Sequence, residues 1–232
     1  MRVLQPANER FHSEIDWLDS WHSFSFGEHY DPKRMGFRAL RVINDDRIAG
    51  GGGFGTHGHR DMEILTWVLD GAVHHRDSTG GEGDIRPGEL QRMTAGRGIR
   101  HSEFNASPTE SLHLLQIWLQ PTVTGLPPGY AQIAFPREGR LGRLQLIASR
   151  DGREGSLSMS AAGEVYASHL RAGDNVAYAV RPGRHIWVQV ARGSLTVNGQ
   201  RAQEGDAVTL SDEAQLTLVG DGDAEVVVFD LE

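Results

Sequence analysis

Short apolar segments of strand length recur along this 232-residue chain, and they constrain the fold more than any other feature. The segments are bounded by turn dipeptides such as Pro87-Gly88 and Asn198-Gly199, and 29 glycines supply the tight turns that many short strands need. The three- and four-residue spacing of an amphipathic helix is nearly absent. The sequence therefore predicts an all-β fold. Typical segments are RALRVIND, EILTWVLDG, LHLLQIWLQP and HIWVQVARGSLTVNG.

A stretch rich in proline and glycine, residues 120–139, divides the chain. It holds four prolines and three glycines, and we expect it to connect two domains. Segments on its two sides are similar, because residues 65–75 resemble 186–199 and residues 85–96 resemble 202–212. A duplicated β-unit is therefore expected, with an N-terminal domain over residues 1–125 and a C-terminal domain over residues 140–232.

Composition excludes several classes of function. The net charge of −8 argues against an extended surface for nucleic acid. There is no cysteine, so disulfides, thiolate catalysis and thiolate metal sites are excluded, and any metal must be held by histidine, carboxylate or water. No apolar run approaches the ~20 residues of a membrane span, and the first residues lack the apolar core of a signal peptide. We expect a soluble cytoplasmic protein that binds neither nucleic acid nor membrane.

Two pairs of residues at i, i+2 spacing are the strongest chemical signal. His57 and His59 lie in GTHGHRDME, and His101 and Glu103 lie in AGRGIRHSEFN. Alternate side chains of a strand share one face, so each pair should point to one side. A single pair of this kind is more often part of a solvated loop. Two pairs on neighbouring strands, however, could converge as three imidazoles and a carboxylate, a set that suits Fe(II), Mn(II), Ni(II), Cu(II) or Zn(II).

Glu63 is a competing carboxylate. It shares the face of His57 and His59 if their strand runs on unbroken, so strand alternation does not choose between Glu63 and Glu103. Gly96 and Gly98 precede the second pair, and we expect them to let the backbone turn tightly and approach the site closely.

Several ordered blocks of this sequence resemble the pirin family. Residues 51–71 resemble the first cupin motif, and residues 96–105 resemble the second with its usual proline replaced. The likeness to pirins covers roughly residues 1–120 and continues more faintly to the C-terminus. It implies a bicupin, with two cupin-type β-barrels in one chain. The blocks are WHSFSFGEHYDP, LRVINDD, GFGTHGHRDMEILTWVLDGAVHHRDS, TAGRGIRHSEFN and LHLLQIWL.

The resemblance also implies a metal and an activity. In pirins the metal, usually iron, is held by the residues that match His57, His59, His101 and Glu103, which leaves Glu63 outside the ligand set. Some members are quercetin 2,3-dioxygenases. The implied function is the opening of the central ring of a flavonol with O2 and release of carbon monoxide, with Fe(II) as the expected metal and Mn, Ni, Co, Cu or Zn as alternatives. Glu103 would accept the proton of the flavonol hydroxyl or orient the substrate.

Two other functions are consistent with the same residues. Some pirins are described as regulators that bind protein partners, with the metal as a redox-responsive element, and an acidic surface fits that role. A different cupin reaction, such as an isomerisation or another dioxygenation, is the third possible function.

The remaining candidates have weaker patterns. His74 and His75 are expected on an ordinary edge strand, with at least one of them facing solvent. His113 alternates in phase with Leu115 and Ile117, which fits either a cavity wall or a hydrogen-bonded core histidine. Four aromatic residues near the N-terminus could line a pocket for a flat substrate, although core packing is the usual role of any one of them: Trp21, Phe24, Phe26 and Phe37.

The C-terminal half lacks a comparable pattern. His185 stands alone before an apolar strand, and no second ligand pair follows it. We therefore expect a C-terminal cupin-like domain without a metal site.

Overall fold

The computed structural model describes residues 1–232 and confirms the predicted all-β class. Helical structure is limited to α1 (Arg137–Arg140) and two 3-10 turns, η1 (Ala7–Glu9) and η2 (Arg153–Gly155). None of these helices has the length and apolar character needed to cross a membrane.

The strands fall into two compact units. The N-terminal unit comprises Arg10–Ala134 with Leu157–Ala161, and the C-terminal unit comprises Met1–Glu9, Phe135–Ser156 and Ala162–Glu232. The strands of the N-terminal unit are β2 (Phe11–Ile15), β3 (Leu18–His22), β4 (Leu40–Ile48), β5 (Gly53–His59), β6 (Glu63–Asp70), β7 (Val73–Asp77), β8 (Glu82–Ile85), β9 (Glu89–Thr94), β10 (Ile99–Asn105), β11 (Leu112–Leu119), β12 (Gly129–Ala134) and β14 (Leu157–Ser158).

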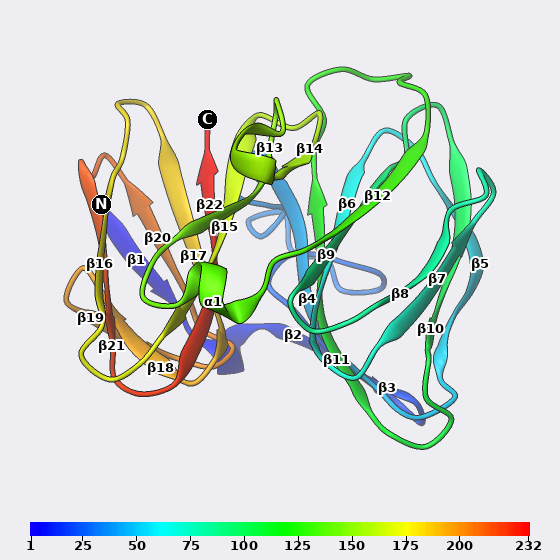
Figure 1. Ribbon diagram of the computed structural model, residues 1–232, viewed down its shortest axis with the longest axis horizontal. Helices are drawn as coiled ribbons and strands as arrows, with labels where there is room; N and C mark the ends of the chain where they lie inside the picture. The colour runs from blue at the N-terminus through cyan, green and yellow to red at the C-terminus, as the bar shows by residue number, and fades with distance from the viewer. The chain divides into compact units, whose positions relative to one another are not determined.

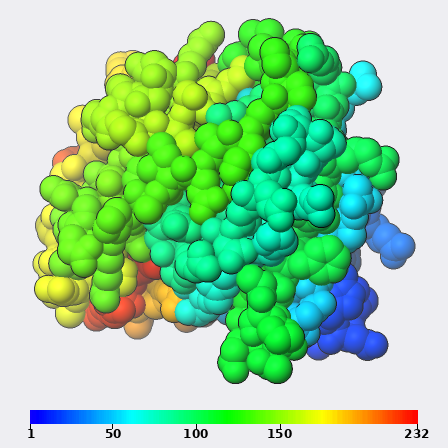
Figure 2. All heavy atoms as spheres, turned by 45° about the vertical axis from the view of Figure 1, so that its right-hand side comes forward, coloured from blue at the N-terminus to red at the C-terminus, as the bar shows by residue number.

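Two antiparallel sheets form the N-terminal unit. The larger sheet has the order β12-β9-β6-β11-β4-β3-β2, and the smaller has the order β5-β10-β7-β8 (Figure 1). Neither sheet closes on itself, so the two sheets form a β-sandwich and not a closed β-barrel. The β7–β8 hairpin, teal in Figure 2, lies at the surface, and its turn residues 78–80 are exposed.

Two separate clusters of buried apolar side chains lie in this unit. One cluster of buried residues contains Ile48, Val68, Val73 and Leu112, and a second contains Ile64, Met93 and other neighbours. The central positions of β6 and β11 carry Thr66 and Gln116, which lie opposite each other and are both buried. Fully buried polar side chains are uncommon, so Thr66 and Gln116 require hydrogen-bond partners inside the unit.

The C-terminal unit is built on the same plan. Its strands are β1 (Arg2–Gln5), β13 (Gln145–Ser149), β15 (Gly163–Leu170), β16 (Asn175–Ala179), β17 (His185–Arg192), β18 (Ser194–Val197), β19 (Gln200–Gln203), β20 (Ala207–Ser211), β21 (Gln215–Gly220) and β22 (Ala224–Leu231). One sheet contains β1-β20-β17-β22-β15-β13 in this order, and the other has the order β16-β21-β18-β19. A continuous apolar core from both sheets, including Val188, Leu195, Leu218 and Val228, fills the space between them.

The units differ from the expected boundaries at both ends of the N-terminal domain. Residues 1–9, expected in that domain, belong to the C-terminal unit because β1 pairs with β20 in register from Arg2↔Leu210 to Gln5↔Ala207. The stretch expected as a connection contains β12, which pairs with β9. The prolines of this stretch lie on either side of Gly129–Ala134. Every residue of the strand therefore has a backbone N–H that can donate a hydrogen bond in the sheet.

Candidate metal centre

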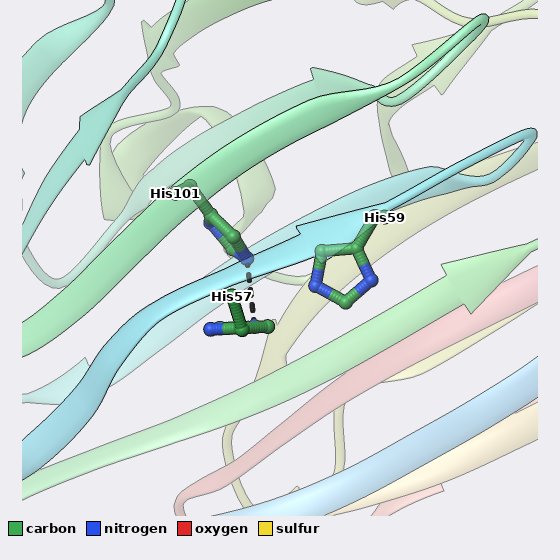
Figure 3. A group of neighbouring side chains, drawn as sticks. All are labelled: His57, His59 and His101. Atoms are coloured by element: carbon green, nitrogen blue, oxygen red, sulfur yellow. Dashed lines mark hydrogen bonds between the residues drawn. The ribbon is translucent and has the colours of Figure 1, made fainter.

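His57 and His59 lie on β5, and His101 and Glu103 lie on the neighbouring strand β10. The two strands are antiparallel, with His57 opposite His101 and His59 opposite Ile99. The side chains of the three histidines point toward one another from these strands (Figure 3). His57 and His59 therefore share one face of β5, as the i, i+2 spacing predicted. The pairing of β5 with β10 places His101 next to them.

A β-bulge lies directly beside the histidines. The register shifts between His101 and Glu103, because Glu103 lies opposite Phe54 and not opposite Gly55. Gly53 follows the bulge with a φ of +158°, and a Cβ there would lie 2.5 Å from the Cα of Phe104. Only glycine fits such a close approach, and bulges of this kind re-aim side chains next to sites.

The imidazole nitrogens of the three histidines are within 4.8 Å of one another. His57 and His101 approach most closely, with 3.1 Å between their Nε2 atoms. The Nδ1 of His57 lies 2.9 Å from the carbonyl oxygen of Gly55 and donates to it, which leaves the lone pair of Nε2 facing the other two rings.

The surroundings keep two of these imidazoles, those of His59 and His101, neutral. Burial first, and then the neighbouring rings of His101 and His57, lower the pKa of His59 to about 4. Burial first, and then the neighbouring rings of His57 and His75, lower the pKa of His101 to about 3. At neutral pH both rings therefore present lone pairs, which is the form that binds a metal ion.

This donor set fits a divalent transition metal. Two nitrogens that lie about 2.1 Å from one ion, at right angles, are separated by about 3 Å, close to the 3.1 Å between His57 and His101. Neutral imidazoles without any thiolate are the ligands that Fe, Ni, Cu and Zn share.

Glu103 is held from the opposite sheet. Gln116 donates a hydrogen bond of 2.8 Å from Nε2 to Oε2 of Glu103, and the hydroxyl of Thr66 lies 3.3 Å from Oε1. The carboxylate belongs to a second group of metal-capable residues, formed with His75 and His101 and entirely buried. His101 is thus common to both groups, whereas Glu103 belongs only to the group with His75.

His75 differs from the sequence-based expectation. It is completely buried, whereas its neighbour His74 is half-exposed and hydrogen-bonded to Asp84 at 2.8 Å. The Nδ1 of His75 lies 3.5 Å from Nδ1 of His101, and its Nε2 lies 3.0 Å from Oδ2 of Asp77. His74 is thus partly exposed to solvent, as expected for at least one of the pair, whereas His75 contacts His101 from the interior.

Asp77 is itself fixed in place. Its Oδ1 accepts hydrogen bonds from the amide and the hydroxyl of Thr79, both at 2.7 Å, and from the amide of Gly81 at 3.1 Å. Behind the site there is therefore a connected series from the β7–β8 turn through Asp77 and His75 to His101, of the kind that orients a ligating histidine.

A cavity of about 610 Å³ opens in front of the histidines. Its walls include His57, His59 and Glu103, together with the aromatic side chains of Phe26, Phe54 and Trp118. Trp118 packs edge-on against His59, with 4.9 Å between ring centroids. Aromatic walls combined with convergent polar side chains are typical of a small-molecule site.

Of the four N-terminal aromatics considered as pocket walls, only Phe26 lines the cavity. Phe24 is buried in the core, and Trp21 stacks on His12 with 4.0 Å between centroids. His113 is a hydrogen-bonded core histidine, because its Nε2 lies 2.7 Å from Asp45. His185, in the other unit, is hydrogen-bonded to Ser211 at 2.9 Å.

Glu63 points away from the histidines. β5 ends at His59, Asp61 adopts a positive φ of 48°, and β6 begins at Glu63, so the strand does not run on unbroken. Glu63 instead accepts a hydrogen bond of 2.9 Å from Thr94.

Sequence reasoning assigned His75 to an ordinary edge strand, whereas β7 lies between β10 and β8, and it did not identify Thr66 and Gln116. Two signals were present in the sequence. Alternation along VHHRD places His75 and Asp77 on the face of Val73, which is buried. Thr66 and Gln116 interrupt two of the most apolar strands of the chain, and a polar residue in such a run needs a partner in the interior.

Comparison with known proteins gives a consistent result over the whole chain. The family model Pirin matches residues 4–119, and the model for the quercetinase C-terminal cupin domain matches residues 146–231. A protein of Escherichia coli K12 named quercetin 2,3-dioxygenase is 48% identical over 232 residues, covering 100% of this chain and 99% of its own length. A pirin-like protein of Caulobacter vibrioides is 40% identical, covering 97% of each chain.

Solved structures agree with these relatives. The bacterial pirin YhhW of Escherichia coli, solved in complex with nickel(II), is 48% identical and superimposes with a TM-score of 0.94 over 100% of this chain and 99% of its own. Both units therefore have the cupin fold.

Proposed function

The chain belongs to the pirin family, and we propose that it is a metal-dependent dioxygenase of the quercetin 2,3-dioxygenase type. One observation carries this proposal: three histidines converge beside an aromatic cavity large enough for a three-ring substrate, and two of them line it. The name of the Escherichia coli relative supports the same reaction. A cytoplasmic location remains a prediction.

The proposed metal ligands are His57, His59, His101 and Glu103. Three imidazoles and one carboxylate leave one or two positions open on a five- or six-coordinate ion. Fe(II) is the proposed native metal, and the nickel(II) complex of YhhW indicates that related sites accept other divalent ions. A bound ion would supply Lewis acidity, lowering the pKa of a substrate hydroxyl, and a template for substrate and O2.

The cavity walls would bind and orient the flavonol. Phe26 and Trp118 meet edge to face with 5.4 Å between centroids, and Phe54 lines the same cavity. Flat aromatic rings pack well against such side chains and displace water from them. These contacts would direct the hydroxyl and the adjacent ketone of the central ring toward the histidines.

Glu103 would help to remove the proton of the flavonol 3-hydroxyl or orient that hydroxyl. One of its oxygens accepts a hydrogen bond from Gln116, and the other lies 3.3 Å from the hydroxyl of Thr66, so the carboxylate is held in one orientation. Loss of the proton leaves an electron-rich enolate, the form of the substrate that reacts with O2. Ring opening with release of carbon monoxide follows.

Oxygen consumption tests this function directly. Protein loaded with Fe(II) should consume O2 when a flavonol is added, and the His57→Ala, His59→Ala variant should not. A substrate panel that also contains non-flavonoid catechols and keto-enols separates a flavonol enzyme from another cupin dioxygenase. Absence of uptake with every compound would instead favour a regulatory pirin that binds protein partners.

A further inference from the structure

A continuous series of hydrogen-bonded side chains lines the cavity wall away from the histidines of β5 and β10. We propose that the series forms a proton relay, which carries the proton released by a hydroxylated substrate from the buried part of the cavity to its mouth. The role of the relay in turnover rests on the proposed dioxygenase function. Its members, from mouth to interior, are His29, Ser13, His22, Ser20 and Asp46.

Three neighbouring strands position the relay. Ser13 on β2 lies opposite Ser20 on β3, and Ser20 lies opposite Asp46 on β4, so the three side chains form one row across the sheet. His22 lies two residues after Ser20, on the same face of β3.

Each consecutive pair of groups is in hydrogen-bonding contact. The Oγ of Ser13 lies 2.9 Å from Nε2 of His29 and 2.9 Å from Nε2 of His22. The Oγ of Ser20 lies 3.4 Å from Nδ1 of His22 and donates a hydrogen bond to Oδ1 of Asp46. The contact at 3.4 Å is the longest, so transfer between Ser20 and His22 is the step most sensitive to geometry.

Burial changes along the series as a relay requires. Ser20, His22 and Asp46 are buried, with exposed fractions of 1%, 3% and 3%. Ser13 and His29 are half-buried, and exposed residues flank His29 on both sides of its loop. One end therefore lies in the interior and the other reaches solvent.

The hydrogen bonds can all point in either direction. When Asp46 is ionised, Ser20 donates to it, Nδ1–H of His22 donates to Ser20, Ser13 donates to Nε2 of His22, and His29 donates to Ser13. When Asp46 holds a proton, every donor and acceptor is exchanged and each contact is still satisfied. A series with two fully bonded states can pass a proton without leaving a buried group unpaired.

The charges of the buried members suit this exchange. Burial raises the pKa of Asp46 to about 7, against the effect of the Ser20 hydrogen bond. Burial also lowers the pKa of His22, with the Asn44 amide acting in the opposite direction, so His22 stays neutral. Both forms of Asp46 are accessible near pH 7. The ionisable groups whose charges act on Asp46 or His22 are Asp45, Asp19, Glu103, His29, Arg10 and His12.

In the proposed step the O–H bond of the substrate hydroxyl breaks, and its electron pair stays on the substrate oxygen. The relay starts with Asp46 protonated, and one proton shifts outward across each contact until His29 releases one to water. The carboxylate that this leaves on Asp46 takes the proton of the substrate hydroxyl, while Glu103 orients that hydroxyl. The reverse sequence returns a proton to the product.

The tautomer of His22 tests the relay without any turnover. In full-length Zn(II)-loaded protein, which is diamagnetic, nitrogen NMR should show His22 protonated at Nδ1 while Asp46 is ionised and at Nε2 once Asp46 is protonated. Carbon NMR of the carboxyl group follows Asp46 in the same titration. The Ser20→Ala variant should lose the switch, and Ser23→Ala, which removes a nearby hydroxyl outside the cavity lining, should keep it. A single His22 tautomer across the titration of Asp46 would overturn the relay.

Kinetics test its part in the reaction. Ser13→Ala and Ser20→Ala should each lower kcat for flavonol consumption by about 10-fold or more, with KM and metal content unchanged, because proton transfer by positioned groups contributes at least this much. His22→Ala should lose as much and recover partly with added imidazole, and Ser23→Ala should match the wild type. Unchanged kcat in both relay serine variants would refute the role in turnover. If wild-type protein consumes no flavonol, the dioxygenase proposal fails, and the tautomer measurement still decides whether the relay exists.

Discussion

Gln116 donates a hydrogen bond of 2.8 Å to Glu103, and this contact connects the two sheets of the N-terminal sandwich at the candidate site. Thr66, next to Gln116 in the larger sheet, lies 3.3 Å from the other carboxylate oxygen. Glu63, three residues before Thr66 on β6, faces the other way and bonds to Thr94. The choice of Glu103 over Glu63 as metal ligand therefore has a structural basis, and it can be tested.

Replacing Glu103 or Glu63 by glutamine should show which of the two carboxylates binds the metal. Glu103→Gln should remove most of the bound metal or abolish activity, because the variant loses an anionic ligand beside three imidazoles. Glu63→Gln should have a smaller effect, within the roughly 10- to 100-fold range of residues outside the ligand set. Metal content by elemental analysis after dialysis measures both. Loss of metal in the Glu63 variant with retention in the Glu103 variant would show that the assignment is reversed.

His75 should strengthen metal binding through His101. Replacement His75→Gln removes the contact with Nδ1 of His101 and the link to Asp77, so the metal affinity should fall about 10- to 100-fold. His74→Gln is the matched control, because His74 is adjacent in sequence but half-exposed. Competition with a chelator gives the affinities, and the Co(II) absorption spectrum reports the ligand geometry. Equal affinities in the two variants would assign His75 a packing role only.

The metal-free protein should lose stability in acid through His59 and His101. Their pKa values are about 4 and about 3 in the folded protein, against 6.5 as the ordinary value. Between these values the unfolded chain binds protons that the folded chain does not, so the free energy of unfolding falls as the pH drops below about 6.5. Asp46, whose pKa is raised, acts in the opposite direction, so wild type must be compared with a variant.

That variant is His59→Gln, His101→Gln. Urea unfolding at pH 7.5, 5.5 and 4.5 should show a steeper loss of stability for wild type than for the double variant. Parallel curves would mean that the two imidazoles titrate normally in the folded protein.

The sequence predicts much of this structure because short-range rules determine it. Strand alternation places His57 with His59, and His101 with Glu103, and it does not depend on the rest of the fold. Alternation also separates His75 from His74, but only after the burial of Val73 shows which face is inside. The all-β class follows from the same local periodicity.

Long-range contacts could not be predicted in this way. The pairing of β1 with β20 joins residues about 200 positions apart, and no local pattern specifies it. The orientation of Glu63 could not be predicted either, because it depends on the positive φ of Asp61. This residue interrupts the strand, and the Glu63 side chain then points away from the histidines. The relay from His29 to Asp46 depends on the register of three strands, and each of its residues alone resembles an ordinary polar residue.

The identity of the metal should control turnover. Oxygen chemistry requires an ion that shares electron density with the substrate or O2, so protein reconstituted with Fe, Mn, Ni, Co or Cu should be more active than protein with Zn. Elemental analysis of protein purified without added metal identifies the native ion, for which Fe(II) is expected. Equal activity with zinc would point to purely Lewis-acid chemistry.

Carbon monoxide release from a matched pair of flavonoids tests the central claim most directly. Quercetin has the free 3-hydroxyl from which the enolate forms, and luteolin lacks it. Metal-reconstituted protein incubated in air should consume quercetin and release carbon monoxide in equal amount, should leave luteolin unchanged, and should lose this activity in the His57→Ala, His59→Ala variant. Slow loss of quercetin at the same rate with wild type and variant, without carbon monoxide, would mean autoxidation and would contradict the assignment of a flavonol dioxygenase.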